Sequence, residues 1–80
     1  MKIKVLGTGC PKCRALEANA RRAVEELGVE AEVSKVTDIS SIMEYDVLMT
    51  PALVIDEKVM ASGRVADVQE IKGWIREAGK

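Results

Sequence analysis

The sequence alternates between short apolar runs and longer segments in which apolar residues recur every three or four positions. Residues 2–6 alternate polar and apolar side chains and then become apolar, residues 52–55 form an apolar run, and residues 58–61 follow that run closely. Such runs are typical of buried strands, and residues 58–61 are predicted to pair with residues 52–55 as a hairpin. Residues 29–36 instead alternate apolar and polar side chains, which predicts a strand with one face in water.

Helical periodicity marks three further segments. The first is predicted to begin at Pro11, because the first turn of a helix accepts proline, and to end at Gly28. The second is a short helix capped by Asp38 that ends near Asp46, and the third begins at Asp67 with a capping-box pattern. The inner faces are expected to carry Cys13, Leu16, Ala20, Val24 and Leu27 in the first helix, Ile39, Ile42 and Met43 in the second, and Val68, Ile71, Trp74, Ile75 and Ala78 in the third.

The resulting order is strand, helix, strand, helix, strand, strand, helix, which predicts an α/β fold. A chain of 80 residues fits one domain, residues 1–80. Met43, Met49 and Met60 are expected to fill gaps in its core. The turn at residues 56–57 lacks the glycine that tight hairpin turns prefer, so the sequence leaves its geometry open.

Charge and composition exclude several classes of function. Lys and Arg number 12 against 13 Asp and Glu, so there is no positive surplus to favour nucleic acid, and aromatic residues make up only 2%. No apolar run approaches the roughly 20 residues that cross a membrane. The apolar part of the N-terminal segment is too short for a signal peptide, so we expect no membrane or nucleic-acid partner and a cytoplasmic location.

Two cysteines, Cys10 and Cys13, carry the candidate chemistry. Histidine is absent, which excludes Cys-His catalysis and the commonest metal ligand. Cys10 falls at the start of the predicted first helix, where unpaired backbone N–H groups favour an anion, so the pKa of its thiol should be lowered. The charges of Lys12 and Arg14 should act in the same direction. Cys13 lies on the inner face and should ionise less readily, as a resolving thiol does.

Four segments together resemble the small thioredoxin-like "redox-active disulfide protein" family of archaea and bacteria. They are residues 10–13 (Cys-Pro-Lys-Cys), 45–47 (Tyr-Asp-Val), 50–55 (Thr-Pro-Ala-Leu-Val-Ile) and 61–65 (Ala-Ser-Gly-Arg-Val). The resemblance covers nearly all of the chain. It implies a thioredoxin-like βαβαββα fold, with a four-stranded mixed sheet flanked by three helices.

The resemblance also implies a function and a site. Cys10 and Cys13 would exchange a dithiol for a disulfide with protein or small-molecule disulfides, with a reductase or dithiol donor as second partner. No cofactor is expected besides the redox-active Cys10–Cys13 disulfide. By analogy the Thr50–Pro51 bond would be cis and adjacent to Cys10, although sequence physics alone favours a trans bond. The residues implied in substrate binding are Pro11, Lys12, Thr50, Pro51 and Gly63.

Two departures from thioredoxins proper concern this site. Gly9 replaces the aromatic residue before the first cysteine, and Lys4 replaces a buried acid six residues before it. The group that takes the proton of Cys13 is therefore left open. Lys35 and Arg64 are expected to be solvated charges. The alternative is that one of these side chains borders the active-site groove.

Two alternatives to a thiol–disulfide oxidoreductase remain open from the sequence. A Cys-x-x-Cys pair also suits Cu(I), as in soft-metal chaperones, but heavy-metal-associated domains end in a strand, whereas this chain is predicted to end in a helix. A zinc site needs four ligands, so two cysteines without histidine would require a dimer. The other alternative is a redox-sensing adaptor in which the cysteines only register oxidation.

Overall fold

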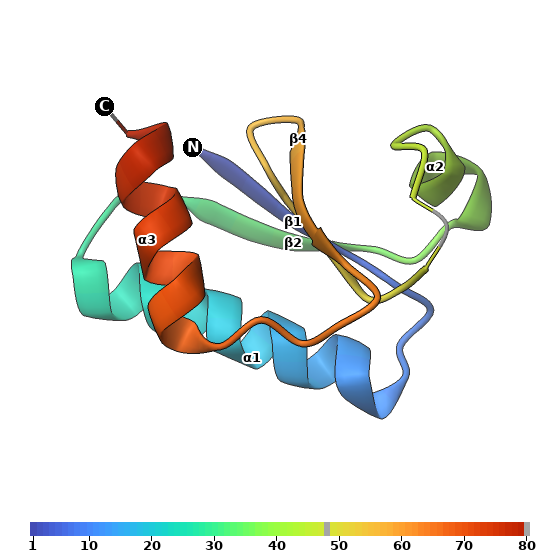
Figure 1. Cartoon of the computed structure of the whole chain (residues 1–80), viewed down its shortest axis with the longest axis horizontal. Coiled ribbons are helices and arrows are strands. Elements are labelled where there is room, and N and C mark those ends of the chain that lie inside the picture. The colour runs from blue at the N-terminus through green and yellow to red at the C-terminus, as the bar shows by residue number, and fades with distance from the viewer. Residues whose placement is uncertain (48, 80) are drawn as a thin grey trace.

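The computed structural model describes residues 1–47 and 49–79 (Figure 1). The elements follow the predicted order and α/β class. They are β1 (Lys2–Leu6), α1 (Pro11–Leu27), β2 (Glu32–Val36), α2 (Ile39–Met43), β3 (Ala52–Ile55), β4 (Lys58–Ser62) and α3 (Val68–Ala78).

The strands form one mixed sheet in the order β2-β1-β3-β4. β1 runs parallel to β2, and α1 makes the crossover between them; β3 is antiparallel to both β1 and β4. Leu6 at the end of β1 pairs with Ala52 at the start of β3. Because of this register, the segments that follow β1 and precede β3 meet at the same end of the sheet. The predicted βαβαββα thioredoxin-like fold is confirmed.

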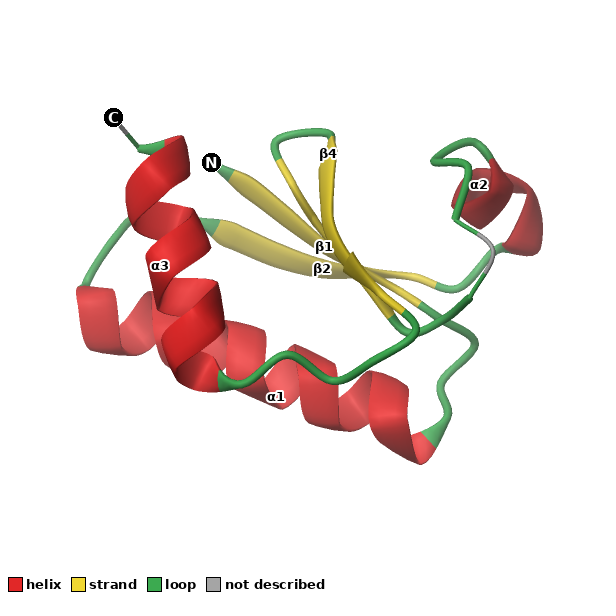
Figure 2. Ribbon diagram, in the orientation of Figure 1, coloured by secondary structure: helices red, strands yellow, loops and turns green. Residues whose placement is uncertain are grey.

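Alternate side chains of the buried strands face two apolar layers. Ile3 and Val5 of β1 pack with α1 and α3 on one face, whereas Leu6 packs with Ile42 of α2 on the other. Figure 2 shows α1 and α3 together on one side of the strands and α2 apart from them. The face covered by α1 and α3 has the larger core, and the half-buried Trp74 packs against it.

The second helix is shorter and less buried than its sequence pattern predicted. It ends at Met43, and of its expected inner face only Ile42 is buried, with 6% of its surface exposed. Ile39 and Met43 are 63% and 66% exposed, and Met49 is 64% exposed. The predictions that Ile39 and Met43 face the core and that Met43 and Met49 fill gaps in it are therefore wrong. A helix of five residues presents only about one turn to the sheet, which leaves room for one inward side chain.

The other element boundaries agree closely with the sequence. Gly28 ends α1 in the left-handed conformation, with φ 65°, and Asp67 and Glu70 form the capping box that begins α3. β2 begins at Glu32 instead of residue 29. The turn after β3 places both Asp56 and Glu57 at positive φ, 48° and 70°, without glycine.

A hydrogen-bonded cluster holds that turn and the region after α2 against β1. Lys4 Nζ donates to Tyr45 Oη at 2.7 Å and to Glu57 Oε1 at 2.8 Å, and Tyr45 Oη donates to Glu57 Oε2 at 3.1 Å. Lys4, which replaces the buried acid of thioredoxins, therefore ties these segments together on the α2 face of the sheet. The hydrogen bonds to Glu57 and Tyr45 raise the pKa of its ammonium group above the usual range.

Candidate active site

The two cysteines lie where β1 ends and α1 begins. Cys10 is the N-cap residue of α1, in an extended conformation, and Pro11 occupies the first turn. Cys10 is half-buried, and both cysteines are free thiols. The first-turn N–H groups of a helix have no partner within the helix, and the positive end of the helix dipole lies there. The sequence therefore places a sulfur where a negative charge is stabilised.

Hydrogen bonds from the first turn single out Cys10 as the thiol that ionises more readily. Its sulfur accepts from the backbone N–H of Cys13 at 3.3 Å and lies 2.7 Å from the Cys13 sulfur. These contacts, first the thiol and then the N–H of Cys13, lower the pKa of Cys10 below its ordinary value. The lowering comes from hydrogen bonds, including those of first-turn N–H groups that the sequence predicted, and the side-chain charges of Lys12 and Arg14 are not among its causes.

Cys13 has the opposite character. Only 5% of its surface is exposed, and it lies one turn before Leu16 on the buried face of α1. Burial is the main cause that raises the pKa of its thiol, and the neighbouring Cys10 acts in the same direction. The predicted asymmetry between an accessible, acidic sulfur and a buried, less acidic one is present.

Gly7 is a part of the site that sequence reasoning identified only as a strand breaker. A Cβ atom at this position would lie 2.3 Å from Cys13 Sγ and 3.1 Å from Cys13 Cβ. The same Cβ would lie 4.0 Å from the Cα of Pro51. The main chain of Gly7 thus lies so close to the buried sulfur that a side chain at this position would overlap it.

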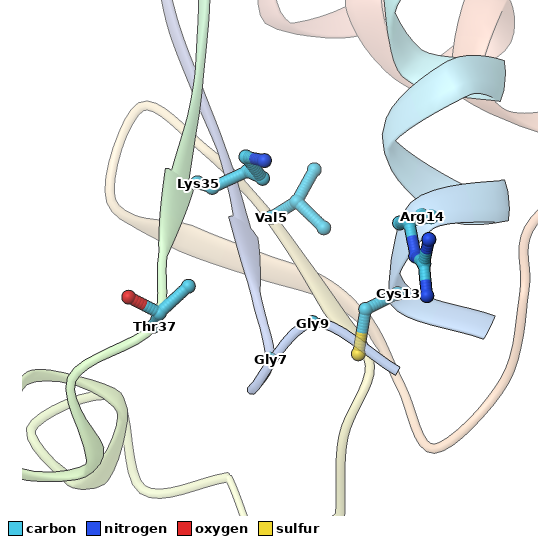
Figure 3. Close-up of a pocket in the computed structure, with 7 residues that line it drawn as sticks. All are labelled: Val5, Gly7, Gly9, Cys13, Arg14, Lys35 and Thr37. Atoms are coloured by element: carbon cyan, nitrogen blue, oxygen red, sulfur yellow. The ribbon is translucent and has the colours of Figure 1, made fainter. Parts of the chain in front are cut away.

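A cavity of about 150 Å³ adjoins the buried sulfur between the ends of β1 and β2 and the start of α1. Its lining is shown in Figure 3 and consists of Val5, Gly7, Gly9, Cys13, Arg14, Lys35 and Thr37. Lys35 reaches from β2 towards Val5 and α1, and Arg14 projects from the first turn of α1 (Figure 3). Of the two charges that the sequence left open, Lys35 therefore borders the site. Arg64 instead forms an ion pair with Glu70 at 2.8 Å.

The Thr50–Pro51 segment precedes β3 at this end of the sheet. Its peptide bond is cis, as the family resemblance implied. Pro51 is buried and Thr50 is exposed. The N–H of Gly63 donates to the carbonyl of Pro51 at 2.9 Å, which joins the end of β4 to the proline segment.

Gly63 has a backbone conformation that favours glycine and little space for a side chain. Its φ is 76°, a conformation that glycine adopts without strain. A Cβ there would lie 3.1 Å from the Cβ of Met49, so the space beside Gly63 is taken by the exposed Met49 side chain.

Lys12, between the two cysteines, is exposed on the first turn of α1.

Neither a metal cluster nor a membrane span accompanies this site within residues 1–47 and 49–79. No group of three or more His, Cys, Asp or Glu side chains is gathered there as metal ligands. No helix in that part of the chain is both long and apolar enough to cross a bilayer.

A helix-capping Cys-x-x-Cys pair with unequal sulfurs, on this fold, defines a thiol–disulfide exchange centre. Residues 1–76 match the model of the thioredoxin domain family. The chain is 46% identical to a thioredoxin of Methanocaldococcus jannaschii over 70 residues, 88% of this chain and 80% of that protein. It is also 46% identical to a thioredoxin of Methanothermobacter thermautotrophicus over 72 residues, 90% of this chain and 94% of that protein.

The chain belongs to the thioredoxin domain family. It is a thioredoxin-type thiol–disulfide oxidoreductase whose active site is the Cys-x-x-Cys pair Cys10 and Cys13. Among residues 1–47 and 49–79 the last element is the helix α3, as in the thioredoxin-like order, whereas a heavy-metal-associated domain has a strand in that place.

Proposed function

We propose that this chain reduces disulfides of proteins, with Cys10 as the attacking sulfur and Cys13 as the resolving sulfur. The observation that carries the proposal is the contrast between two sulfurs 2.7 Å apart, one with a lowered and one with a raised pKa. The attacking species in disulfide exchange is a thiolate, and its partner has to stay protonated until the second step.

The proposed reaction has two steps. The Cys10 thiolate attacks one sulfur of the substrate disulfide, forms a mixed disulfide and releases the other substrate sulfur as a thiolate. Cys13 then loses its proton and attacks Cys10 Sγ, which breaks the mixed disulfide and releases the second substrate sulfur. Two electrons pass to the substrate, and the chain is left with a Cys10–Cys13 disulfide.

Substrate binding is proposed at the residues around Cys10. The main chain of the exposed residue Thr50 would pair with an extended substrate segment, as in strand addition. Pro51 would form the floor of this groove, Gly63 would shape its β4 side through its hydrogen bond to Pro51, and Pro11 and Lys12 would border it on the α1 side.

The proposed cycle also needs a second partner. A reductase or a small dithiol donor would return the disulfide to the dithiol, and small-molecule disulfides would serve as further substrates. A dithiol that works in its reduced form suits a reducing compartment, so we propose the cytoplasm.

Cysteine variants test the assignment of the two roles. Cys10→Ser should abolish reduction of a protein disulfide such as that of insulin, because no accessible thiolate remains. Cys13→Ser should accumulate a mixed disulfide at Cys10, which mass spectrometry of the intact protein detects as an added substrate mass. Retention of reducing activity in Cys10→Ser, with a mixed disulfide at Cys13, would reverse the roles and refute the proposal.

A further inference from the structure

The segment between α2 and β3 carries Thr50, the residue proposed to pair with a substrate segment. No hydrogen bond joins the main chain of Thr50 to another residue that the structure describes. That main chain is therefore open to a substrate, but its position depends on what holds the chain on either side of it. On one side, the carbonyl of Pro51 accepts from the N–H of Gly63 at 2.9 Å. On the other side, the segment begins at Tyr45.

The side chain of Tyr45 anchors the start of this segment. Its hydroxyl accepts from Lys4 Nζ at 2.7 Å and donates to Glu57 Oε2 at 3.1 Å. Lys4 Nζ also donates to Glu57 Oε1 at 2.8 Å and lies 5.5 Å from the centroid of the Tyr45 ring. These three side chains, the Lys4 cluster, form a closed ring of hydrogen bonds.

We propose that the Lys4 cluster positions residues 45–51 for substrate binding. Lys4 and Tyr45 are then positioning residues that promote the reaction of Cys10 with protein disulfides, which pair along Thr50, and not its reaction with small disulfides, which do not. The inference rests on the proposed function, since it concerns the segment that would receive the substrate.

Lys4 is held on both sides by the sheet. Its backbone lies in β1, an interior strand, between Ser34 of β2 and Val54 of β3. Its side chain is 26% exposed. Hydrogen bonds from a charged donor are stronger than those between neutral groups, and partial removal from water strengthens them further. The ammonium group is therefore a fixed point to which a neighbouring segment is tied.

Apolar contacts alone would not fix the segment in this way. The half-buried side chains of Tyr45 and Val47 pack against the small core on the α2 face of the sheet. Apolar burial has no preferred direction, whereas a hydrogen bond requires a particular distance and angle. The core contacts thus keep the segment near the sheet, and the two hydrogen bonds of the Tyr45 hydroxyl determine where on the sheet it lies.

Glu57 completes the cluster from the turn after β3. Its hydrogen bonds to Lys4 and Tyr45 lower the pKa of its carboxyl group, so it is charged near neutral pH. Its carboxylate accepts with one oxygen from Lys4 and with the other from Tyr45. Glu57 therefore holds the ammonium group and the hydroxyl in a fixed arrangement.

A purely stabilising role of the cluster makes a different prediction. If the cluster only stabilised the fold, its loss would lower the free energy of unfolding without favouring one class of disulfide over another. If it positions residues 45–51, its loss slows the reaction with a disulfide that pairs along Thr50. A small disulfide that needs only the Cys10 sulfur would react as before.

The experiment compares two disulfides that react with the reduced protein in the absence of any other reductant. One is insulin, whose disulfides join polypeptide chains, and the other is 4,4′-dithiodipyridine, which has no main chain. The measured quantity is the ratio of the insulin rate constant to the dithiodipyridine rate constant. Urea unfolding gives the stability of each variant.

The variants are Tyr45→Phe, Lys4→Met and Lys4→Arg. Lys72→Met is the matched control, because the side chain of Lys72 is 14% exposed and pairs with Glu26 at 2.9 Å. Like Lys4, Lys72 joins two elements, but these are α3 and α1 on the other face of the sheet.

We expect the rate ratio to fall in the two variants that break the cluster. Tyr45→Phe keeps the ring and removes both hydrogen bonds of the hydroxyl, so the ratio should fall about two- to tenfold, the range for the net loss of a hydrogen bond. Lys4→Met should lower the ratio at least as much. Lys4→Arg keeps the charge and the N–H donors and should retain most of the ratio. Lys72→Met should lose stability and keep the ratio.

An unchanged ratio in Tyr45→Phe or Lys4→Met overturns the proposal. An equal fall of both rate constants in these variants also overturns it, and so does a lower ratio in Lys72→Met. Failure of the proposed function looks different, because the unaltered protein would then react with dithiodipyridine and leave the disulfides of insulin intact.

Discussion

Replacement of Gly7 by alanine tests whether close packing at the end of β1 fixes the position of the Cys13 sulfur. The new Cβ would lie 2.3 Å from Cys13 Sγ. Non-bonded heavy atoms come to rest at about 3.5–4.0 Å, so the contact has to open by at least about 1.2 Å. The φ of Gly7 is not in the left-handed region, so the substitution introduces this clash without backbone strain.

The sulfur has little freedom to avoid the new methyl group. Cys13 lies in the first turn of a helix, where one of the three staggered side-chain rotamers is disfavoured, and its sulfur lies 2.7 Å from the sulfur of Cys10. Relief therefore requires the sulfur to turn away from Cys10, or β1 or the start of α1 to move. Overpacking of this kind costs about 1–3 kcal/mol, against a total stability of about 4–12 kcal/mol for a chain of 80 residues.

The loss should appear in two measurements. The midpoint temperature of thermal unfolding of the reduced protein should fall by about 5–20 °C. The pH profile of Cys10 alkylation should move to higher pH, because the thiol and backbone N–H of the displaced Cys13 no longer lie as close to the Cys10 sulfur. Gly73→Ala in α3 is the control, since its Cβ would meet no atom within 4 Å and should stabilise the protein by about 0.5–1 kcal/mol.

A Gly7→Ala variant that melts within one or two degrees of the unaltered protein, with the same alkylation profile, would refute this account. Such a result would mean that the two elements adjust freely at their junction and that Gly7 does not position the sulfur.

Two further predictions concern surface interactions that hold the elements in place. The pKa of Glu57 is lowered by its hydrogen bonds to Lys4 and Tyr45, so its contribution to stability is present above the ordinary Glu pKa of 4.5 and is lost as the pH falls through the lower folded value. In urea unfolding at several pH values, the difference in free energy of unfolding between the unaltered protein and Glu57→Gln should therefore shrink on acidification. A difference in free energy that stays constant from pH 7 to 3 would contradict this role of Glu57. Asp67→Ala removes the N-cap of α3 and should destabilise by about 0.5–2 kcal/mol in the same assay, whereas Asp67→Asn should retain most of the stability.

The places of the two cysteines in the fold are predictable from local patterns in the sequence. The spacing of Cys10 and Cys13 at the start of an amphipathic segment predicts both the helix-capping sulfur and the buried one. This inference succeeds because helix capping and helix periodicity depend on residues within a few positions of each other.

The second helix marks the limit of such local reasoning. Ile39, Ile42 and Met43 have the spacing of an inner face, yet only Ile42 is buried. Whether an apolar side chain is covered depends on how much of the sheet the helix reaches, and a helix of five residues reaches little of it.

The hairpin turn is a different case. Asp56 and Glu57 lack the composition of a tight primed turn, but both adopt positive φ. Their side chains are held by distant partners, since Asp56 accepts from the N–H of Lys2 at 2.9 Å and Glu57 accepts from Lys4 at 2.8 Å. These partners lie more than fifty positions away in the chain, so local turn preferences could not reveal them.

The amino-acid order alone thus determines the elements, the capping cysteine and the identity of the reactive pair, because short-range interactions govern each of them. Only the folded chain decides that Gly7 lies against the buried sulfur and close to Pro51, and that Lys35 borders the cavity beside that sulfur. Those juxtapositions depend on strand register, and register is set by pairing between segments that are far apart in the sequence.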